Sequence, residues 1–306
     1  MLATISYPPI PALELGPLTL SLHGLFAALG FLAGAWLLVR LAGARGYDTI
    51  KLQSVLTWAL VGSLLGARYL TAPAAIVDGV PLGVALNPIQ GSFSIMGGFA
   101  GGILVGAFRA RRLRMRFLPI ASMAAPGLAV GTVVGRIGDL AIVEHLGVAT
   151  TSALGYGVLP GYDLAPQHNN LECAVLPPGA EYCGVYHHTA LYDLLGALVL
   201  LGVLLWLYRA WTSRRYGQLF AVWITWYGLQ RFAIDFTRYS PDDPVNADRV
   251  LGALTWSQWA GLGGAVLGLA LFVLWWRTQP TESAEQDAAY QAEVDDRPTV
   301  EESPGL

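Results

Sequence analysis

The segment HTALYDLLGALVLLGVLLWLY (residues 188–208) decides the class of fold. Its one acidic side chain is Asp193, and it contains no lysine or arginine. An α-helix rises ~1.5 Å per residue, so the segment is long enough to cross the ~30 Å hydrocarbon core of a bilayer. The sequence therefore predicts a transmembrane helix here.

Other apolar stretches of similar length make most of the chain membrane-embedded. Of 306 residues, 54% are hydrophobic and 13% are charged, whereas about a quarter of a soluble domain is charged. The predicted spans are 20–43, 52–77, 93–108, 118–144, 188–208, 218–237 and 252–276, of which the third is short and rich in glycine. We therefore predict an all-α polytopic membrane protein with seven transmembrane helices.

The distribution of positive charge predicts the orientation. Lysine and arginine follow the first, third, fifth and seventh spans, whereas loops 78–92 and 145–187 contain neither. Because cytoplasmic loops carry the excess of positive charge, we expect the N-terminus outside and the C-terminus in the cytoplasm, across a bacterial inner membrane. The expected organisation is an extracytoplasmic lead-in (1–19), a transmembrane domain (20–277) with a small extracytoplasmic loop subdomain (145–187), and a disordered, acidic cytoplasmic tail (278–306).

The loops carry two further signals. Cys173 and Cys183 share the external loop, where an oxidising environment favours a disulfide, although two unpaired thiols are the alternative. The five arginines between 109 and 116 directly follow a span, so anionic membrane lipids are their expected partners. We expect no nucleic-acid binding, no metal and no cofactor.

Several ionisable side chains lie inside the predicted spans, where each is costly. Arg68, Arg136 and Arg231 fall in the outer half of three different spans, and guanidinium groups suit phosphate. They therefore predict a site for an anion, with a phospholipid headgroup as the expected ligand. The alternative is neutralisation within each helix, because Asp139 follows Arg136 by three residues and Asp235 follows Arg231 by four.

Glycines are concentrated in GSFSIMGGFAGG (91–102), at Gly97, Gly98, Gly101 and Gly102. Small residues on one surface let two helices approach closely. The same bare surface could instead leave room for a lipid headgroup.

GRIGDLAIVEHLG (135–147) resembles the signature of the prolipoprotein diacylglyceryl transferase family. The matching positions are Gly135, Arg136, Gly138, Glu144 and Gly147. Further segments are similar to family motifs in the same order: LSLHGLFAALGF (20–31), LLGARYL (64–70), GSFSIMGGFAGG (91–102), HHTALYDLL (187–195) and YGLQRFAIDFTRYSPDD (227–243).

The resemblance implies a reaction. The family transfers the diacylglyceryl group of phosphatidylglycerol to the lipobox cysteine thiol of prolipoprotein signal peptides, releasing glycerol phosphate. Such a step needs stabilisation of the leaving phosphate and help in deprotonating the thiol. The expected catalytic residues are Arg136, Arg231, His23 and Glu144, and the expected substrate-binding residues are Arg68, Gly97, Gly98, Asp139, Gly147, His187, Tyr192, Asp193, Asp235 and Arg238.

The chain also departs from the family pattern. Met96 stands where the family has histidine, and Asp139 stands where its signature has asparagine. His23 could supply the missing imidazole as the base, with His145 and His187 as alternatives. The departures leave three other functions open: transfer to a different acceptor, a catalytically silent phospholipid-binding protein, and an anion transporter.

Overall fold

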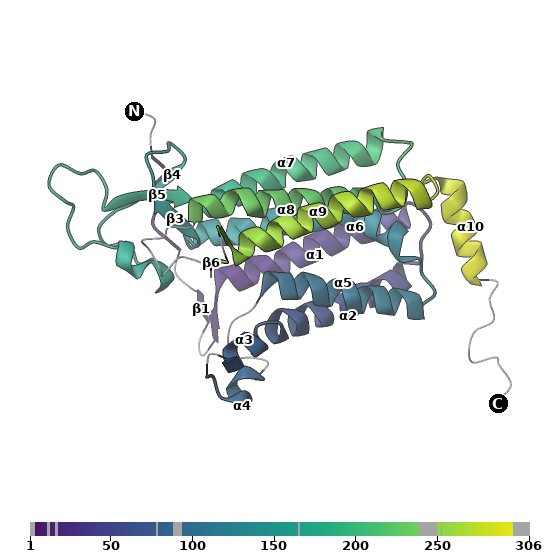
Figure 1. The fold of residues 1–306 in the computed structure, drawn as a ribbon, viewed down its shortest axis with the longest axis horizontal. Coiled ribbons are helices and arrows are strands. Elements are labelled where there is room, and N and C mark those ends of the chain that lie inside the picture. Colours follow the sequence, from purple (N-terminus) through teal and green to yellow (C-terminus); the bar gives the residue numbers. More distant parts are fainter. Residues whose placement is uncertain are drawn as a thin grey trace. The chain divides into compact units, whose positions relative to one another are not determined.

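The structure is a computed structural model that describes residues 4–10, 13–15, 18–77, 79–87, 94–164, 166–238, 250–251 and 253–295. Helices make up most of these residues (Figure 1). The chain divides into two compact units. The first unit comprises Met1–Leu37 and Ser122–Thr281, and the second comprises Leu38–Ala121 and Glu282–Leu306.

The first unit is built mainly from long apolar helices. It holds most of α1 (Leu22–Gly43) and α6 (Phe117–Ala141), with α7 (Thr189–Ala210), α8 (Gln218–Arg238) and α9 (Trp256–Thr278). Glycine permits close packing of two pairs. A Cβ atom on Gly30 would lie 2.6 Å from the carbonyl oxygen of Gly131, and one on Gly228 would lie 2.5 Å from that of Gly261. Larger residues there would force α1 from α6, or α8 from α9.

The predicted external subdomain contains a small antiparallel sheet, in the order β3 (Leu146–Ala149), β5 (Gly184–His188) and β4 (Gly155–Val158). A 3₁₀ helix, η1 (Pro166–Leu171), follows β4, and a disulfide joins Cys173 to Cys183. The N-terminal lead-in packs on this sheet, since Ile5 forms a β-bridge with Tyr156. The fold is therefore not purely helical. The expectation of an all-α chain missed the sheet because strand pairing joins segments far apart in sequence.

Two hairpins complete the strands of the first unit. β1 (Leu13–Leu15) pairs with β2 (Leu18–Leu20) just before α1, and β6 (Val250–Leu251) pairs with β7 (Leu254–Thr255) just before α9. Thr255 then begins α9 with a capping box, in which its hydroxyl accepts from the backbone N–H of Gln258.

The second unit is centred on a close pair of helices, α2 (Thr49–Tyr69) and α5 (Ile95–Arg112). A Cβ atom on Gly62 of α2 would lie 2.5 Å from the carbonyl oxygen of Gly101. Gly97, Gly98 and Gly102 of α5 also face α2. Helix packing therefore occupies the glycine surface, which favours the close-approach interpretation over a space for a headgroup. The side chain of Met96 lies outside the described residues.

The second predicted span is shorter than expected. Residues 52–77 were predicted to form one helix, but α2 ends at Tyr69 and the chain turns into α3 (Ala72–Val77) and then α4 (Leu82–Ala85). Pro73 explains the break, because proline lacks an N–H and its ring clashes with the preceding helical turn.

Part of the acidic tail differs from the expected disorder. Residues Ala284–Asp295 form α10, and the carboxylates of Glu282 and Asp287 are buried. Both acids have partners elsewhere in the second unit: Arg45 contacts Glu282 at 3.0 Å, and the Tyr47 hydroxyl donates to Asp287 at 2.6 Å. These long-range pairs stabilise a segment whose composition alone predicts disorder. Residues 296–306 lie outside the described part of the chain.

Five helices among the described residues are long and apolar enough to cross a membrane: α1, α2, α6, α7 and α9. Large apolar side chains such as Leu32, Trp36 and Trp206 are exposed on them, as expected of surfaces that face lipid. The chain is therefore a polytopic membrane protein. The two other predicted spans, α5 and α8, are helical but carry more charge.

Candidate active site

The site is centred on the end of α6, where Arg136 and Asp139 lie one turn apart. Nη1 of Arg136 contacts one carboxylate oxygen of Asp139 at 2.6 Å. Nη2 contacts a carboxylate oxygen of Asp193, in the first turns of α7, at 2.9 Å. Arg136 is therefore held between two carboxylates from different helices. Asp139 neutralises it from within α6, and Asp193 pairs with it from α7.

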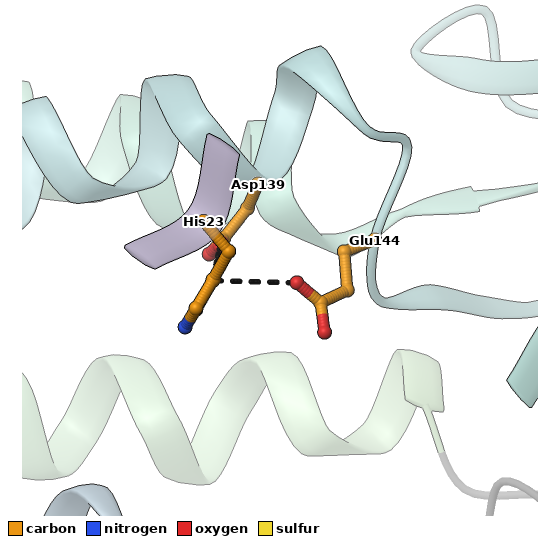
Figure 2. A group of neighbouring side chains, drawn as sticks. All are labelled: His23, Asp139 and Glu144. Atoms are coloured by element: carbon orange, nitrogen blue, oxygen red, sulfur yellow. Dashed lines mark hydrogen bonds and ion pairs between the residues drawn. The ribbon is translucent and has the colours of Figure 1, made fainter. Parts of the chain in front are cut away.

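His23 reaches the same cluster from the first turn of α1 (Figure 2). Its Nδ1 lies 2.6 Å from Asp139 and 3.3 Å from Glu144, which follows α6. Asp139 thus uses one oxygen for His23 and the other for Arg136. The Asp139 side chain is 3% exposed, whereas that of His23 is 48% exposed, so the imidazole lies at the accessible edge of the cluster.

The opposite edge of His23 faces away from both carboxylates. Figure 2 shows the second ring nitrogen, Nε2, pointing away from Asp139 and Glu144. With Nδ1 protonated and donating to a carboxylate, Nε2 carries the lone pair that can accept a proton. A carboxylate orients an imidazole through one ring nitrogen in the Ser-His-Asp triad of hydrolases as well.

Two more arginines lie near Arg136, both on α8. Arg231 donates from Nη2 to Ser257 at 2.9 Å and lies 3.4 Å from Asp235. Asp235 is buried and also accepts a hydrogen bond from Thr255. Arg238 lies within electrostatic range of both Arg136 and Arg231. Of the three arginines expected to form the anion site, Arg136 and Arg231 therefore lie near each other, together with Arg238.

Arg68 has a different set of partners, within the second unit. Its buried guanidinium donates to the backbone carbonyl oxygens of Asn87 at 2.7 Å, Val84 at 3.0 Å and Ala85 at 2.6 Å. These bonds hold the C-terminal end of α4 and the residues after it against the end of α2. They differ from the anion-binding role expected of Arg68, because its donors point to carbonyl oxygens of its own unit.

His145 contacts Arg238 through one ring nitrogen. Nη2 of Arg238 donates to His145 Nδ1 at 3.2 Å, so this nitrogen is an acceptor. Burial, assisted by the charge of Arg238, lowers the pKa of His145 to about 4. His145 is therefore neutral near pH 7, and its acceptor nitrogen is already engaged.

The remaining predicted residues lie around the sheet and the start of α7. Nδ1 of His187 lies 2.9 Å from the Tyr192 hydroxyl, and burial lowers the pKa of His187. A Cβ atom at Gly147 would collide with the carbonyl oxygen of Thr237 and lie 3.0 Å from the Cβ of His187. Gly147 therefore lets the sheet approach α8 closely.

Sequence reasoning missed several residues that organise the site. Gln230 donates to the Asp193 carboxylate at 3.1 Å and to its backbone oxygen at 3.0 Å. Tyr227 lies within electrostatic range of Arg136, Asp193 and Arg231. Ser257 holds Arg231. The signal for Gln230 and Tyr227 was a polar side chain in an apolar helix beside a charged one.

Comparison with known proteins identifies the family of this chain. Residues 11–274 match the family model described as prolipoprotein diacylglyceryl transferase. A phosphatidylglycerol–prolipoprotein diacylglyceryl transferase of Solidesulfovibrio magneticus is 30% identical over 284 residues, covering 90% of this chain and 96% of the relative. Proteins of the same name from Gloeobacter violaceus and Bifidobacterium longum subsp. infantis are each 28% identical, covering 90% and 98% of this chain and 94% and 95% of the relatives. The chain therefore belongs to the prolipoprotein diacylglyceryl transferase family.

Proposed function

We propose that this chain transfers the diacylglyceryl group of phosphatidylglycerol to the thiol of the lipobox cysteine in prolipoprotein signal peptides, releasing glycerol phosphate. Relatives that align over nearly their whole length are named for phosphatidylglycerol and prolipoprotein. One observation in the structure carries the proposal: Glu144, His23, Asp139, Arg136 and Asp193 form a single connected set. It offers a proton acceptor and a phosphate ligand within one cluster.

The reaction forms one bond and breaks one bond. The cysteine sulfur attacks the terminal glycerol carbon of the diacylglyceryl group, and the bond from that carbon to the phosphate oxygen breaks. The electron pair of this bond leaves with glycerol phosphate, and the thiol proton passes to a base. His23 is the proposed base, because Nδ1 is oriented by Asp139 and Glu144 while Nε2 faces outward.

Arg136 is the proposed ligand of the leaving phosphate. A guanidinium has five N–H donors. Its ion pairs with Asp139 and Asp193 engage Nη1 and Nη2, one carboxylate each. Among the contacts of the described residues, Nε–H and a second hydrogen on each terminal nitrogen remain for phosphate oxygens. Arg231 and Arg238 add positive charge nearby and are the proposed partners of the headgroup.

We also propose seven transmembrane helices, comprising the five apolar ones together with α5 and α8. Contacts within the second unit support this number, because α10 touches Arg45, which follows α1, and Arg116, which follows α5. These three segments therefore share one side of the membrane. Between Arg45 and Arg116 the chain passes α2 and α5, and both must cross to return to the same side. Between Arg116 and α10, the same reasoning requires α8 to cross along with α6, α7 and α9.

The first unit supports the same parity. Ile5 pairs with Tyr156 of the loop subdomain, so the lead-in and the loop lie on one side. Four helices, α1, α2, α5 and α6, separate them. The positive charges favour a cytoplasmic location for the Arg45 side. The proposed orientation therefore has an external N-terminus and loop 145–187 and a cytoplasmic tail 278–306, in the inner membrane.

Accessibility labelling tests the topology. Single cysteines introduced in 150–185 should react with an impermeant maleimide in intact cells, and those in 109–116 should react only after permeabilisation. For the outside probes, the native pair Cys173 and Cys183 remains oxidised. The opposite pattern would overturn the orientation and every assignment that depends on it.

The activity is tested with purified protein in phosphatidylglycerol vesicles and a lipobox peptide. We expect release of glycerol phosphate that depends on the peptide cysteine, together with rescue of a bacterium depleted of its own transferase. Release without the peptide would favour a different acceptor, which the Met96 and Asp139 departures leave open. Binding of phosphatidylglycerol without release would indicate a silent lipid-binding protein.

A further inference from the structure

The C-terminal helix α10 lies beyond the family match, which ends at residue 274. It is nevertheless docked in the second unit through side chains on two different loops. Arg45, after α1, contacts Glu282 at 3.0 Å and Asp287 at 3.9 Å. Arg116, after α5, lies 3.7 Å from the ring centroid of Tyr290. This docking is a feature of the chain that the activity of the family does not explain.

Docking depends on buried charge. The side chains of Glu282 and Asp287 are only 2% and 3% exposed, so their carboxylates have lost most of their water. Such groups are stable only when paired. Their partners include the guanidinium of Arg45 and the Tyr47 hydroxyl. Loss of Arg45 to another anion would therefore remove an ion pair that both buried carboxylates share.

Phospholipid phosphates are anions that can reach the same two arginines. Arg45 follows the end of α1 at Gly43 by two residues, and Arg116 follows the end of α5 at Arg112 by four. Both therefore lie at the membrane surface, where phospholipid phosphates are concentrated. Phosphate accepts a bidentate pair from arginine at least as well as carboxylate does.

The negative charge of α10 also favours its release from an anionic membrane. The helix contains Glu285, Asp287, Glu293 and Asp295 and no lysine or arginine. An anionic surface attracts the arginines of the two loops and repels this segment. The two effects together oppose docking when the inner leaflet is rich in anionic lipid.

We propose that α10 and anionic phospholipid headgroups compete for Arg45 and Arg116, so that α10 is docked on a weakly anionic membrane and released from a strongly anionic one. In the docked state, the carboxylates of this segment occupy the arginine that lipid phosphates would otherwise bind. Because phosphatidylglycerol is itself anionic, release would follow the abundance of the proposed substrate. The competition does not require transferase activity.

Amide hydrogen exchange of residues 284–292 reports the docked state. A free helix of this length is unstable in water, so release exposes its amides to rapid exchange. The full-length protein is reconstituted in phosphatidylcholine nanodiscs with increasing phosphatidylserine, at fixed ionic strength. Phosphatidylserine is anionic but is not the proposed substrate. Each arginine near an anionic surface contributes about fivefold, so two should lower the docked-to-released ratio by about 30-fold.

Three variants sharpen the test. The double variant Glu282→Gln/Asp287→Asn should exchange rapidly at every lipid composition. Glu285→Gln removes the same type of charge from an exposed position of α10 and should stay protected without anionic lipid, as the native protein does. Arg45→Gln should release α10 even without anionic lipid.

The outcomes separate this proposal from the proposed function. Equal effects of phosphatidylserine and phosphatidylglycerol support competition, whether or not the protein is an active transferase. Exchange that is independent of anionic lipid would make α10 a permanent structural clasp and overturn the proposal. An effect of phosphatidylglycerol alone would trace release to the catalytic site and overturn it too, as would a double variant that stays protected.

Discussion

Replacing Arg136 by alanine separates a catalytic role from a structural one, because the side chain has both kinds of partner. If Arg136 binds the leaving phosphate, its loss removes a charge-assisted contact that strengthens in the transition state. Such contacts contribute ~2.7–4 kcal/mol, so turnover should fall by about 100- to 1,000-fold. Arg136→Lys should recover little, because an ammonium group cannot reproduce the two-pronged contact with phosphate.

The same substitution also disturbs the protein. Asp139 keeps His23 at 2.6 Å, whereas within the described part of the chain the Asp193 carboxylate keeps the amide of Gln230 as its hydrogen-bond donor. Removing one partner of a buried ion pair costs about 3–5 kcal/mol. Low activity of the alanine variant alone would therefore be ambiguous.

A second substitution removes the ambiguity. Arg136→Ala/Asp193→Asn eliminates the unpaired carboxylate, so thermal stability should recover while release of glycerol phosphate stays low. Arg214→Ala is the matched control: Arg214 is buried in the same unit but donates to the backbone oxygens of Tyr208 and Trp211. It should lose stability and keep its activity per folded molecule. Recovery of activity in the double variant would refute the phosphate role and leave Arg136 as an ion-pair member.

Four other changes have defined outcomes. His23→Gln should lower turnover steeply at pH 7 and recover partly above pH ~8.5, where the substrate thiol ionises unaided; Met96→His in that background should restore some activity, and a fully active His23→Gln protein would remove His23 from the mechanism. Arg68→Met should increase proteolysis of the loop around residues 79–87 with little change in the KM for phosphatidylglycerol, whereas a large rise in KM would return Arg68 to the anion site. Relative to the oxidised native protein, Cys173→Ser should destabilise the external subdomain by about 2.7 kcal/mol from loop-closure entropy, measured by thermal unfolding. The reduced native protein should match the variant, and no difference between oxidised and reduced protein would exclude a stabilising disulfide. Burial lowers the pKa of His188 to about 4, so the unfolded state binds more protons than the folded state between pH ~6.5 and 4. As the pH falls through that range, the free energy of unfolding of the subdomain should therefore fall by up to about 3 kcal/mol. His188→Gln should flatten this pH dependence.

Local pattern predicted the parts of the fold that depend on neighbouring residues. Continuous apolar runs located the helices, and spacing of three or four residues predicted the pairs Arg136–Asp139 and Arg231–Asp235. These interactions lie within one helix, where geometry follows from residue number. The boundary errors have local causes as well, since Pro73 ends the second predicted span early.

The rest depended on contacts between distant segments. No periodicity links Asp193 to Arg136 or Ser257 to Arg231, although both contacts shape the site. Arg68 shows the same limit in reverse. Arg68 lies in the predicted half of its span. The direction of its side chain is set by the backbone carbonyl oxygens of Val84 and Asn87, more than a dozen residues later in the chain. The position of a charged residue along its helix could be predicted from the sequence. The direction in which its side chain points and the residue that it contacts could not.

The balance of charge ties the base to the leaving group. At rest, Arg136, Arg231 and Arg238 lie near Asp139, Asp193 and Asp235, so these six groups carry no net charge. Transfer converts a phosphate diester to a monoester, which adds negative charge as the carbon–oxygen bond breaks. The proton that His23 takes from the thiol adds one positive charge to the same cluster, through Asp139. The protonated His23 and the phosphate bound to Arg136 carry opposite charges, so each stabilises the other. This mutual stabilisation depends on Asp139, which contacts both His23 and Arg136. Asp139→Asn should strengthen the hold of Arg136 on phosphate, lowering KM, and weaken the orientation of His23, lowering kcat. A fall in kcat with an unchanged or higher KM, or a lower KM with an unchanged kcat, would show that Asp139 does not couple the two groups.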